Sequence, residues 1–151
     1  SYPRKYREPD FRIARQAMEQ MGIEDLAEMQ LSRLSGGTRQ KVYLAMALAQ
    51  QAPVIVMDEP TTYLDIGQQV KFAEELAEEG KTVILVLHDI LLALKISGRI
   101  AAVGEGKVVW SGTPEEMLEQ NVAKRLYGVA VGAARTDAGI QYYYEIKNYT
   151  A

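Results

Sequence analysis

Apolar residues recur at helical spacing in the first third of the chain, and they gather into short continuous runs further along. Asp10 can cap a first helix that ends at Gly22 and carries apolar side chains on one side, namely Phe11, Ala14, Met18 and Met21. The elements expected next are a short helix over residues 23–30, a turn over 31–37 and a strongly apolar helix over 38–51. The N-terminal part is therefore predicted to be helical throughout.

Two short apolar runs, residues 54–57 and 83–87, are rich in β-branched side chains, as is typical of buried parallel strands. Residues 66–79 between them form an amphipathic pattern, with Gly80 placed to end the helix. The side chains expected to face inward from this helix are Val70, Ala73, Leu76 and Ala77. This order predicts a β-strand, α-helix, β-strand unit.

The remaining pattern predicts a helix over 90–97, a strand pair over 100–103 and 108–111, short helices over 114–119 and 121–127, and a terminal hairpin over 130–135 and 140–146. Thr113-Pro114-Glu115-Glu116 supplies a capping box and an N1 proline for the helix that it opens. The expected organisation is a helical subdomain over residues 1–52 followed by an α/β core over 53–151.

Composition narrows the possible classes of protein. A chain of 151 residues can bury roughly two-thirds of its unfolded surface. Its net charge is -3 and its acidic and basic residues are interspersed, so the sequence has no basic patch of the kind that binds nucleic acid. The absence of Cys fits a reducing compartment. Because no apolar stretch reaches the roughly 18 residues of a membrane span, any membrane association is expected to go through a partner.

Candidate chemistry begins at Ser35-Gly36-Gly37, which opens a predicted helix. Free N–H groups and the positive end of the helix dipole would converge there with no side chain to block an anion. Taken alone, this tripeptide is more typical of a simple turn and N-cap. The motifs around the tripeptide decide whether it is an anion-binding helix start or only a turn with an N-cap.

Acidic residues and the single histidine follow the two predicted strands. Asp58 and Glu59 end the first strand and precede Pro60, at the sheet edge where open α/β sheets bind ligands, although acids at such junctions also serve solubility. Asp65 could be only the N-cap of the next helix. His88 follows the second strand, and a lone histidine is usually structural.

The motifs occur in one order: Leu34-Ser35-Gly36-Gly37-Thr38-Arg39-Gln40, Val54-Ile55-Val56-Met57-Asp58-Glu59-Pro60, Thr61-Thr62-Tyr63-Leu64-Asp65 and His88. In that order they resemble the signature motif, Walker B with its glutamate, D-loop and switch histidine of ATP-binding cassette (ABC) ATPases. The resemblance implies an α/β fold: a partial, P-loop NTPase-like ABC ATPase core with a helical subdomain at its N-terminal end.

The resemblance also implies roles for these residues. Ser35, Gly36 and Gly37 would contact the γ-phosphate of ATP held by the opposite subunit, with Thr38 in place of the family's usual Gln. Asp58 would act on Mg²⁺ through its water shell, and Glu59 would be the general base. Asp65 would lie at the dimer seam, and His88 would hydrogen-bond the γ-phosphate and sense its loss.

A P-loop, Gly-x-x-x-x-Gly-Lys-Ser/Thr, does not occur in the sequence. Gly80-Lys81-Thr82 has the required ending, but Glu75 stands where the first Gly belongs. Gly104-Glu105-Gly106-Lys107 lacks the Ser/Thr and is typical of a hairpin turn. The chain is therefore expected to be the C-terminal portion of a cassette, with Tyr2-Pro3 resembling the dipeptide that often follows the family's Q-loop.

Within the family, Thr61 to Ile66 with Gln69, and Val86 to Asp89, look most like ATPase subunits of importers for iron-siderophores, haem or cobalamin. Such subunits bind ATP and Mg²⁺, dimerise, and work on the inner face of the cell membrane with two permease subunits and a substrate-binding protein. The expected partners are thus a second ATPase subunit, permease subunits and the missing N-terminal P-loop half, with no nucleic acid. The fragment alone is expected to be inactive.

Two alternative functions stay open, a soluble ABC ATPase without transport and a non-catalytic module that pairs with a separate N-terminal half. The run Tyr142-Tyr143-Tyr144 could stack on adenine or on nucleic acid. The favoured interpretation is that these are alternating strand residues on a half-buried hairpin.

Overall fold

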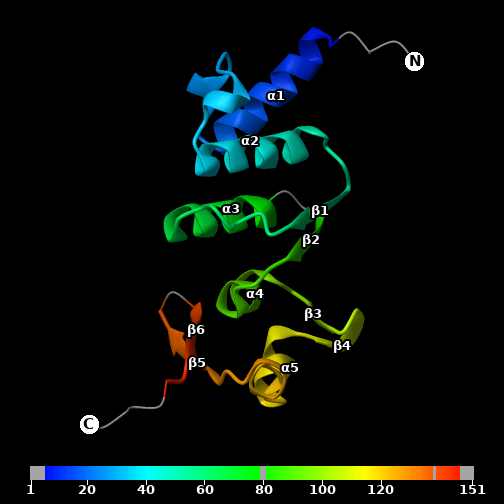
Figure 1. Ribbon diagram of the computed structural model, residues 1–151, viewed down its shortest axis with the longest axis vertical. Coiled ribbons are helices and arrows are strands. Elements are labelled where there is room, and N and C mark those ends of the chain that lie inside the picture. Colours follow the sequence, from blue (N-terminus) through cyan, green and yellow to red (C-terminus); the bar gives the residue numbers. More distant parts are fainter. Residues whose placement is uncertain (1–5, 79–80, 138, 147–151) are drawn as a thin grey trace. The chain divides into compact units, whose positions relative to one another are not determined.

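A computed structural model describes residues 6–78, 81–137 and 139–146 of the chain. The chain divides into two compact units, Ser1–Val86 and Leu87–Ala151 (Figure 1). The first unit contains α1 (Glu8–Gln20), α2 (Gly36–Ala49), β1 (Val54–Asp58), α3 (Ile66–Glu78) and β2 (Thr82–Val86). The second contains α4 (Ile90–Ile96), β3 (Ile100–Gly104), β4 (Lys107–Gly112), α5 (Pro114–Glu119), α6 (Val122–Tyr127), β5 (Val131–Thr136) and β6 (Gly139–Tyr144).

Helix α2 lies in the first unit between α1 and the layer formed by α3, β1 and β2 (Figure 1). Its buried side chains, Leu44, Ala45 and Leu48, belong to the same apolar cluster as Ile55 and Met57 of β1. The helical segment and the β-strands therefore share one core. For this reason the expected boundary between residues 52 and 53 falls inside the first unit, and the division comes after β2.

Helix α1 begins earlier than expected, so that Asp10 is not its N-cap residue. The helix begins at Glu8, and Asp10 is its third residue, where the carboxylate accepts a hydrogen bond from the Arg7 backbone N–H at 2.7 Å. Pro9 in the first turn lacks an N–H that would be unpaired there in any case. Gly22 follows the helix with a φ of 61°, which a glycine adopts without steric cost.

The segment predicted as a helix over residues 23–30 forms only a 3₁₀ turn at Glu24–Leu26, and a second 3₁₀ turn follows at Leu31–Arg33. Ile23 is buried, but Met29 is largely exposed, so little apolar surface is covered. A helix of this length must offset a costly nucleation step by packing, and this segment has little packing to offer.

Strands β1 and β2 pair in parallel, with Ile55 opposite Val83 and Met57 opposite Leu85, which confirms the predicted unit. Helix α3 covers them with Phe72, whereas Val70, expected to face inward, is 47% exposed. The prediction was wrong at Val70 because Phe72, two residues further on, takes the position in the core. Gly80 and the side chains of Leu76 and Ala77 lie outside the described residues.

The second unit builds its own core around Leu94, Met117, Val122 and Ala123. Thr113 and Glu116 form the predicted capping box at the start of α5, with hydrogen bonds of 3.3 and 2.8 Å. The turn between β3 and β4, at Glu105 and Gly106, has φ values of 50° and 73°, as a tight hairpin requires. The terminal strands β5 and β6 pair antiparallel as expected.

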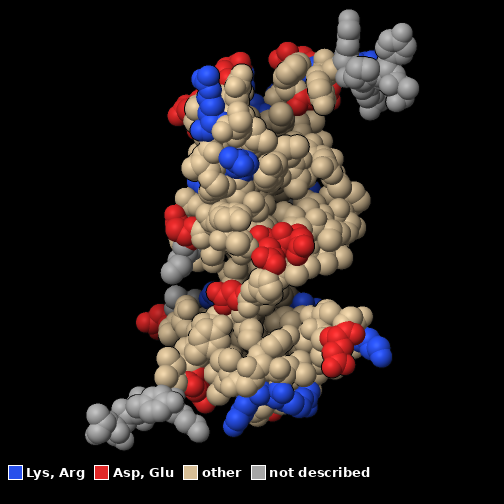
Figure 2. All heavy atoms as spheres, viewed as in Figure 1, with Lys and Arg blue, Asp and Glu red and all other residues tan. Residues whose placement is uncertain are grey.

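Acidic and basic side chains are interspersed on the face shown in Figure 2. Within the described part of the chain, no helix is long and apolar enough to pass through a bilayer.

Candidate functional site

Ser35 caps α2 in the way the sequence predicts. Its Oγ accepts a hydrogen bond from the Thr38 backbone N–H at 3.2 Å and lies 2.8 Å from the Thr38 hydroxyl oxygen. Gly36 and Gly37 form the first turn and add no side chain in front of the helix end. A fourteen-residue helix therefore presents N–H groups and the positive end of its dipole at this point, which suits an anionic ligand.

Gly37 is also constrained from a second side, which the sequence does not reveal. A Cβ placed on it would come 2.9 Å from the Tyr63 carbonyl oxygen, whereas one on Gly36 would reach only the Tyr63 ring, at 4.0 Å. The start of α2 thus packs directly on the backbone of the loop between β1 and α3. The structure brings the signature-like motif and the acidic loop together within the first unit.

The acidic pair stands at the end of β1. Asp58 is exposed and lies opposite Val86 in the register, and the Glu59 N–H donates to the Val86 carbonyl oxygen at 3.0 Å. Glu59 has a φ of 46°, in a backbone region that side-chain-bearing residues rarely adopt and that often marks functional positions. The backbone therefore changes direction at Glu59, directly after β1 ends.

The Thr62 hydroxyl is within hydrogen-bonding distance of the Glu59 carboxylate, a contact that the sequence does not predict. The Thr62 hydroxyl lies 3.1 Å from Glu59 Oε2 and 3.1 Å from the Glu59 carbonyl oxygen. A threonine three residues after an acid is a common local pattern, so the sequence carried only a weak signal for it.

Asp65 precedes α3 and accepts the Gln68 backbone N–H at 2.9 Å through Oδ1. The N-cap interpretation of Asp65 is therefore confirmed, and it is compatible with a further role for the loop. His88 belongs to the second unit, where it is exposed and precedes Asp89, the N-cap of α4. Asp89 Oδ1 accepts the N–H groups of Leu91 and Leu92 at 2.9 and 3.2 Å.

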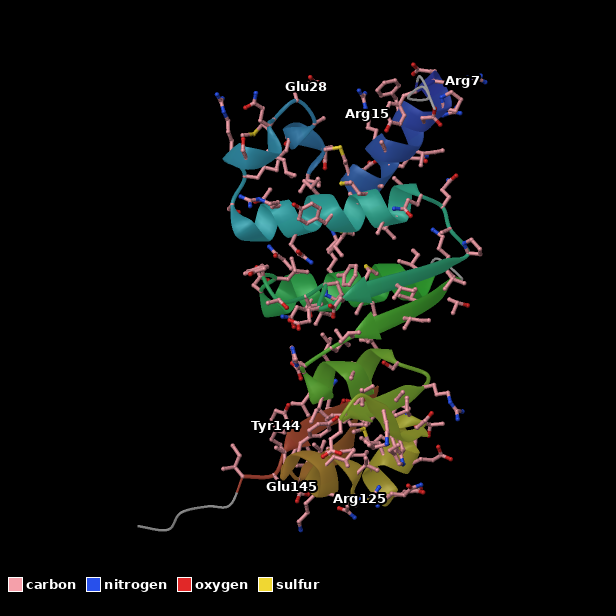
Figure 3. All side chains as sticks on the ribbon, turned by 45° about the vertical axis from the view of Figure 1, so that its right-hand side comes forward. Arg7, Arg15, Glu28, Arg125, Tyr144 and Glu145 are labelled. Atoms are coloured by element: carbon pink, nitrogen blue, oxygen red, sulfur yellow. The ribbon has the colours of Figure 1, made fainter. Side chains whose placement is uncertain are left out.

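Tyr142 packs on the core of the second unit, while Tyr143 and Tyr144 are largely exposed. Strand β6, which carries them, lies beside α4, and Figure 3 marks Tyr144 near the end of that strand. The run thus lies on a hairpin, as expected, with Tyr142 half-buried, but burial does not alternate along it, because Tyr143 and Tyr144 are both exposed.

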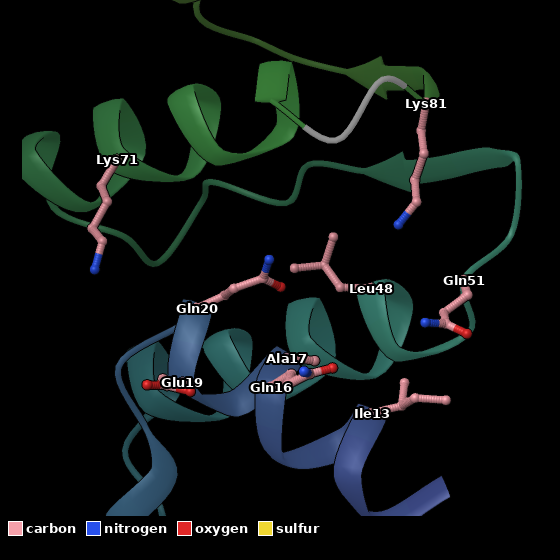
Figure 4. Close-up of a pocket in the computed structure, with 9 residues that line it drawn as sticks. All are labelled: Ile13, Gln16, Ala17, Glu19, Gln20, Leu48, Gln51, Lys71 and Lys81. Atoms are coloured by element: carbon pink, nitrogen blue, oxygen red, sulfur yellow. The ribbon is translucent and has the colours of Figure 1, made fainter. Parts of the chain in front are cut away.

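A cavity of about 510 Å³ lies elsewhere in the first unit, between α1 and α2 on one side and Lys71 and Lys81 on the other (Figure 4). Its polar lining includes Gln16 and Gln20 of α1. None of the predicted site residues lines it, so the cavity is separate from the chemistry described above.

Comparison with known proteins identifies the family to which the chain is similar. The family model for ABC transporters matches residues 4–62. The ferric enterobactin transport ATP-binding protein of Escherichia coli strain K12 is 38% identical over 129 residues, which are 83% of this chain and 48% of that protein. The hemin import ATP-binding protein of Aliivibrio fischeri is 39% identical over 123 residues, 77% of this chain and 48% of that protein. The chain thus spans about half the length of these relatives.

Solved structures give the same result for the fold. A metal-chelate type ABC transporter in an inward-facing conformation superposes with a TM-score of 0.80 at 22% identity, over 97% of this chain and 61% of that one. A dimeric bacterial ABC transporter cassette superposes with a TM-score of 0.66 at 31% identity, over 75% of this chain and 51% of that one. The same cassette is also known in a post-hydrolysis state bound to ADP and phosphate, with the same scores.

Proposed function

Because this chain belongs to the ABC transporter ATPase family, we propose that it supplies the signature and Walker B side of an ATP-hydrolysing importer subunit. The transported substrate is a metal chelate such as an iron-siderophore, haem or cobalamin, since the relatives are named for ferric enterobactin and hemin import. In the complete cassette, meaning this chain joined to a P-loop half, residues 1–52 form the signature subdomain. Residues 53–151 then belong to the α/β core.

The observation that carries this proposal is the contact between two motifs that lie far apart in the sequence. The helix start at Ser35 to Gly37 packs on the loop that leaves Glu59, with Gly37 against the Tyr63 carbonyl oxygen. The helix start suits an anion and the acidic strand end suits a metal ion and water, and their contact within one core supports a cassette in which each motif serves one of the two ATP sites of a dimer.

The acidic pair supports a division of roles. Glu59 is the general base that orients the attacking water, a role supported by its unusual backbone conformation at the end of β1 and by the Thr62 hydroxyl, 3.1 Å from its carboxylate. Asp58 is exposed at the strand end and acts on Mg²⁺ through the water shell that this ion gives up reluctantly. His88 senses the γ-phosphate of ATP, and Ser35 to Thr38 contact ATP held by a second subunit.

One face of the β1–β2 sheet supports the proposal that a P-loop half covers it. Four apolar side chains on this face are strongly exposed: Val54 49%, Val56 67%, Ile84 52% and Val86 50%. Within the described residues the sheet has only these two strands, and the chain spans about half of its relatives' length. Apolar surface of this kind marks an interface, so we assign it to the missing half.

The other partners follow from the family. We expect a second ATPase subunit, two permease subunits at the inner face of the cell membrane, and a separate substrate-binding protein, with no nucleic acid. The dimeric cassette among the structural relatives supports the second subunit.

Phosphate release from the complete cassette tests the proposal. Glu59→Gln keeps the side chain's size but removes the base, so hydrolysis should fall by on the order of 10² or more. ATP-bound dimers should then accumulate on gel filtration. Glu28→Gln, at an exposed position, removes the same charge and should leave turnover unchanged. Near-normal turnover of Glu59→Gln without a trapped dimer would mean that the acidic pair is a structural strand end, and the interaction-module function would then take precedence.

A further inference from the structure

Two glutamine side chains from different helices hydrogen-bond the backbone of one short segment, residues 60–64. Gln40 of α2 donates through Nε2 to the Pro60 carbonyl oxygen at 2.9 Å. Gln69 of α3 donates through Nε2 to the Leu64 carbonyl oxygen at 3.0 Å and to that of Thr61 at 3.3 Å. The segment is thus held near both of its ends.

These contacts replace water that the segment cannot reach. Pro60 and Thr61 are buried, so their carbonyl oxygens need donors from within the protein. Gln40 supplies one to Pro60, and Thr61 accepts from the Leu64 N–H at 3.0 Å as well as from Gln69. Pro60 itself brings no N–H to the local hydrogen bonding. An amide is well suited to this task, because it donates without carrying a charge and does not titrate.

The segment connects the residues to which the proposed function assigns chemistry. It leaves Glu59, whose N–H is bonded to the Val86 carbonyl oxygen, and it leads into Asp65, which caps α3. Gln40 lies three residues after Gly37 on the same face of α2, and both contact the segment. A shift at the start of α2 is therefore passed to the segment at two points.

We propose that Gln40 and Gln69 are positioning residues. They hold the segment over residues 60–64, so that Glu59 keeps its left-handed backbone conformation and its carboxylate keeps its orientation. This inference rests on the proposed function for the role of Glu59. Gln40 also links the signature helix to that base, so that a ligand at the start of α2 influences the base through one side-chain hydrogen bond.

Isosteric reversal of the hydrogen bond gives the sharpest test. Gln40→Glu keeps the shape but places a carboxylate against the Pro60 carbonyl oxygen, and the two acceptors repel. Partial burial and the facing carbonyl oxygen raise the pKa of the introduced carboxyl above its ordinary value of about 4.3, so the defect should be present at pH 8 and recover as the carboxyl becomes protonated and donates again toward pH 5. Gln50→Glu, on an exposed residue just after α2, makes the same chemical change without the contact. Gln68→Glu serves in the same way as the control for Gln69→Glu.

Hydrogen exchange of the chain as it stands reads out the backbone directly. In Gln40→Glu and Gln69→Glu, protection of the peptide covering residues 58–65 should fall by about tenfold or more at pH 8, because the Glu59 and Leu64 amides lose their support. In the complete cassette the kcat for ATP should fall by between about 10-fold and 10²-fold, with KM unchanged and recovery at low pH. A general loss of folding would not recover in this way.

The positioning role is refuted if Gln40→Glu and Gln69→Glu match their controls in exchange protection or in kcat. If Glu59→Gln is itself fully active in the same cassette, the proposed function fails instead. The exchange measurement then still decides whether the two glutamines hold the segment.

Discussion

Gly37 lies so close to Tyr63 that an added Cβ would meet the Tyr63 carbonyl oxygen at 2.9 Å. Real Cβ atoms are essentially never found so near a backbone atom, so this glycine is required by packing as well as by access for an anion. A Cβ on the neighbouring Gly36 would have only an ordinary van der Waals contact, at 4.0 Å. Packing therefore requires glycine at position 37 but not at position 36, where only access for an anion favours it.

Gly37→Ala should destabilise the first unit, because either α2 or the loop at Tyr63 must move. We expect a loss of about 1–3 kcal/mol in the free energy of unfolding, the usual range for overpacking. Gly36→Ala should cost less or even stabilise, since alanine favours a helix over glycine by up to about 1 kcal/mol. Denaturant unfolding followed by circular dichroism measures both, and equal stabilities for the two variants would contradict the close approach.

The uncovered face of the β1–β2 sheet should make the chain self-associate. Val56 lies opposite Ile84 in the register, and both are strongly exposed, so Val56→Thr with Ile84→Thr should lower the mass seen by light scattering. The matched control is Val103→Thr with Val108→Thr, an exposed valine pair on the β3–β4 hairpin. A well-behaved monomer for the unmodified chain would count against a missing half.

Asp58→Asn in the complete cassette should weaken the response of turnover to Mg²⁺. The carboxylate at the end of β1 serves the metal, and the amide has no charge with which to do so. A Mg²⁺ titration of phosphate release measures the effect, with Glu59→Gln as the comparison, because that variant should lose turnover at every Mg²⁺ concentration. An unchanged titration curve would remove Asp58 from the metal site.

His88→Ala should lower turnover while leaving ATP binding nearly unchanged, because a switch residue acts on the γ-phosphate after binding. Isothermal titration with ATP and phosphate release together separate the two quantities. If binding fell as much as turnover, the histidine would be a binding residue rather than a switch.

Alkaline pH should loosen the docking of β6 on α4. Burial and the nearby Asp89 charge raise the pKa of Tyr144, and burial with the Glu115 charge raises that of Tyr142. A raised folded-state pKa favours the neutral phenol, so the stabilisation is complete below the unfolded value of about 10 and is lost as the pH rises through the folded value. Melting temperatures of the second unit, followed by fluorescence of the single tryptophan, should therefore fall above about pH 10.

The double variant Tyr142→Phe with Tyr144→Phe should flatten that alkaline fall, because no phenol remains to ionise at the contact. Tyr143→Phe, on the opposite face of the same strand, should leave it largely in place. Identical pH profiles for the two variants would exclude ionisation of these phenols as the cause.

The sequence by itself determined the features that depend on neighbours along the chain. The parallel strands β1 and β2, the Ser35 cap and the Thr113 capping box are confirmed, because β-branched residues favour a strand locally and a cap's hydrogen bonds involve residues within a few positions. The expected burial of the two strands is confirmed for one face only, since Val54, Val56, Ile84 and Val86 are exposed. The order of the motifs, and with it the family, also came from the linear pattern.

Only the tertiary structure decided what depends on distant contacts. Gln40 reaches Pro60 twenty positions away, and Phe72 rather than Val70 fills the core under β1. Helix α2 shares its core with the strands, and the chain divides into compact units after residue 86, while the subdomain boundary after residue 52 stays a prediction. Such pairings are set by how helices and sheet pack together, and the spacing of residues along one element does not contain that information.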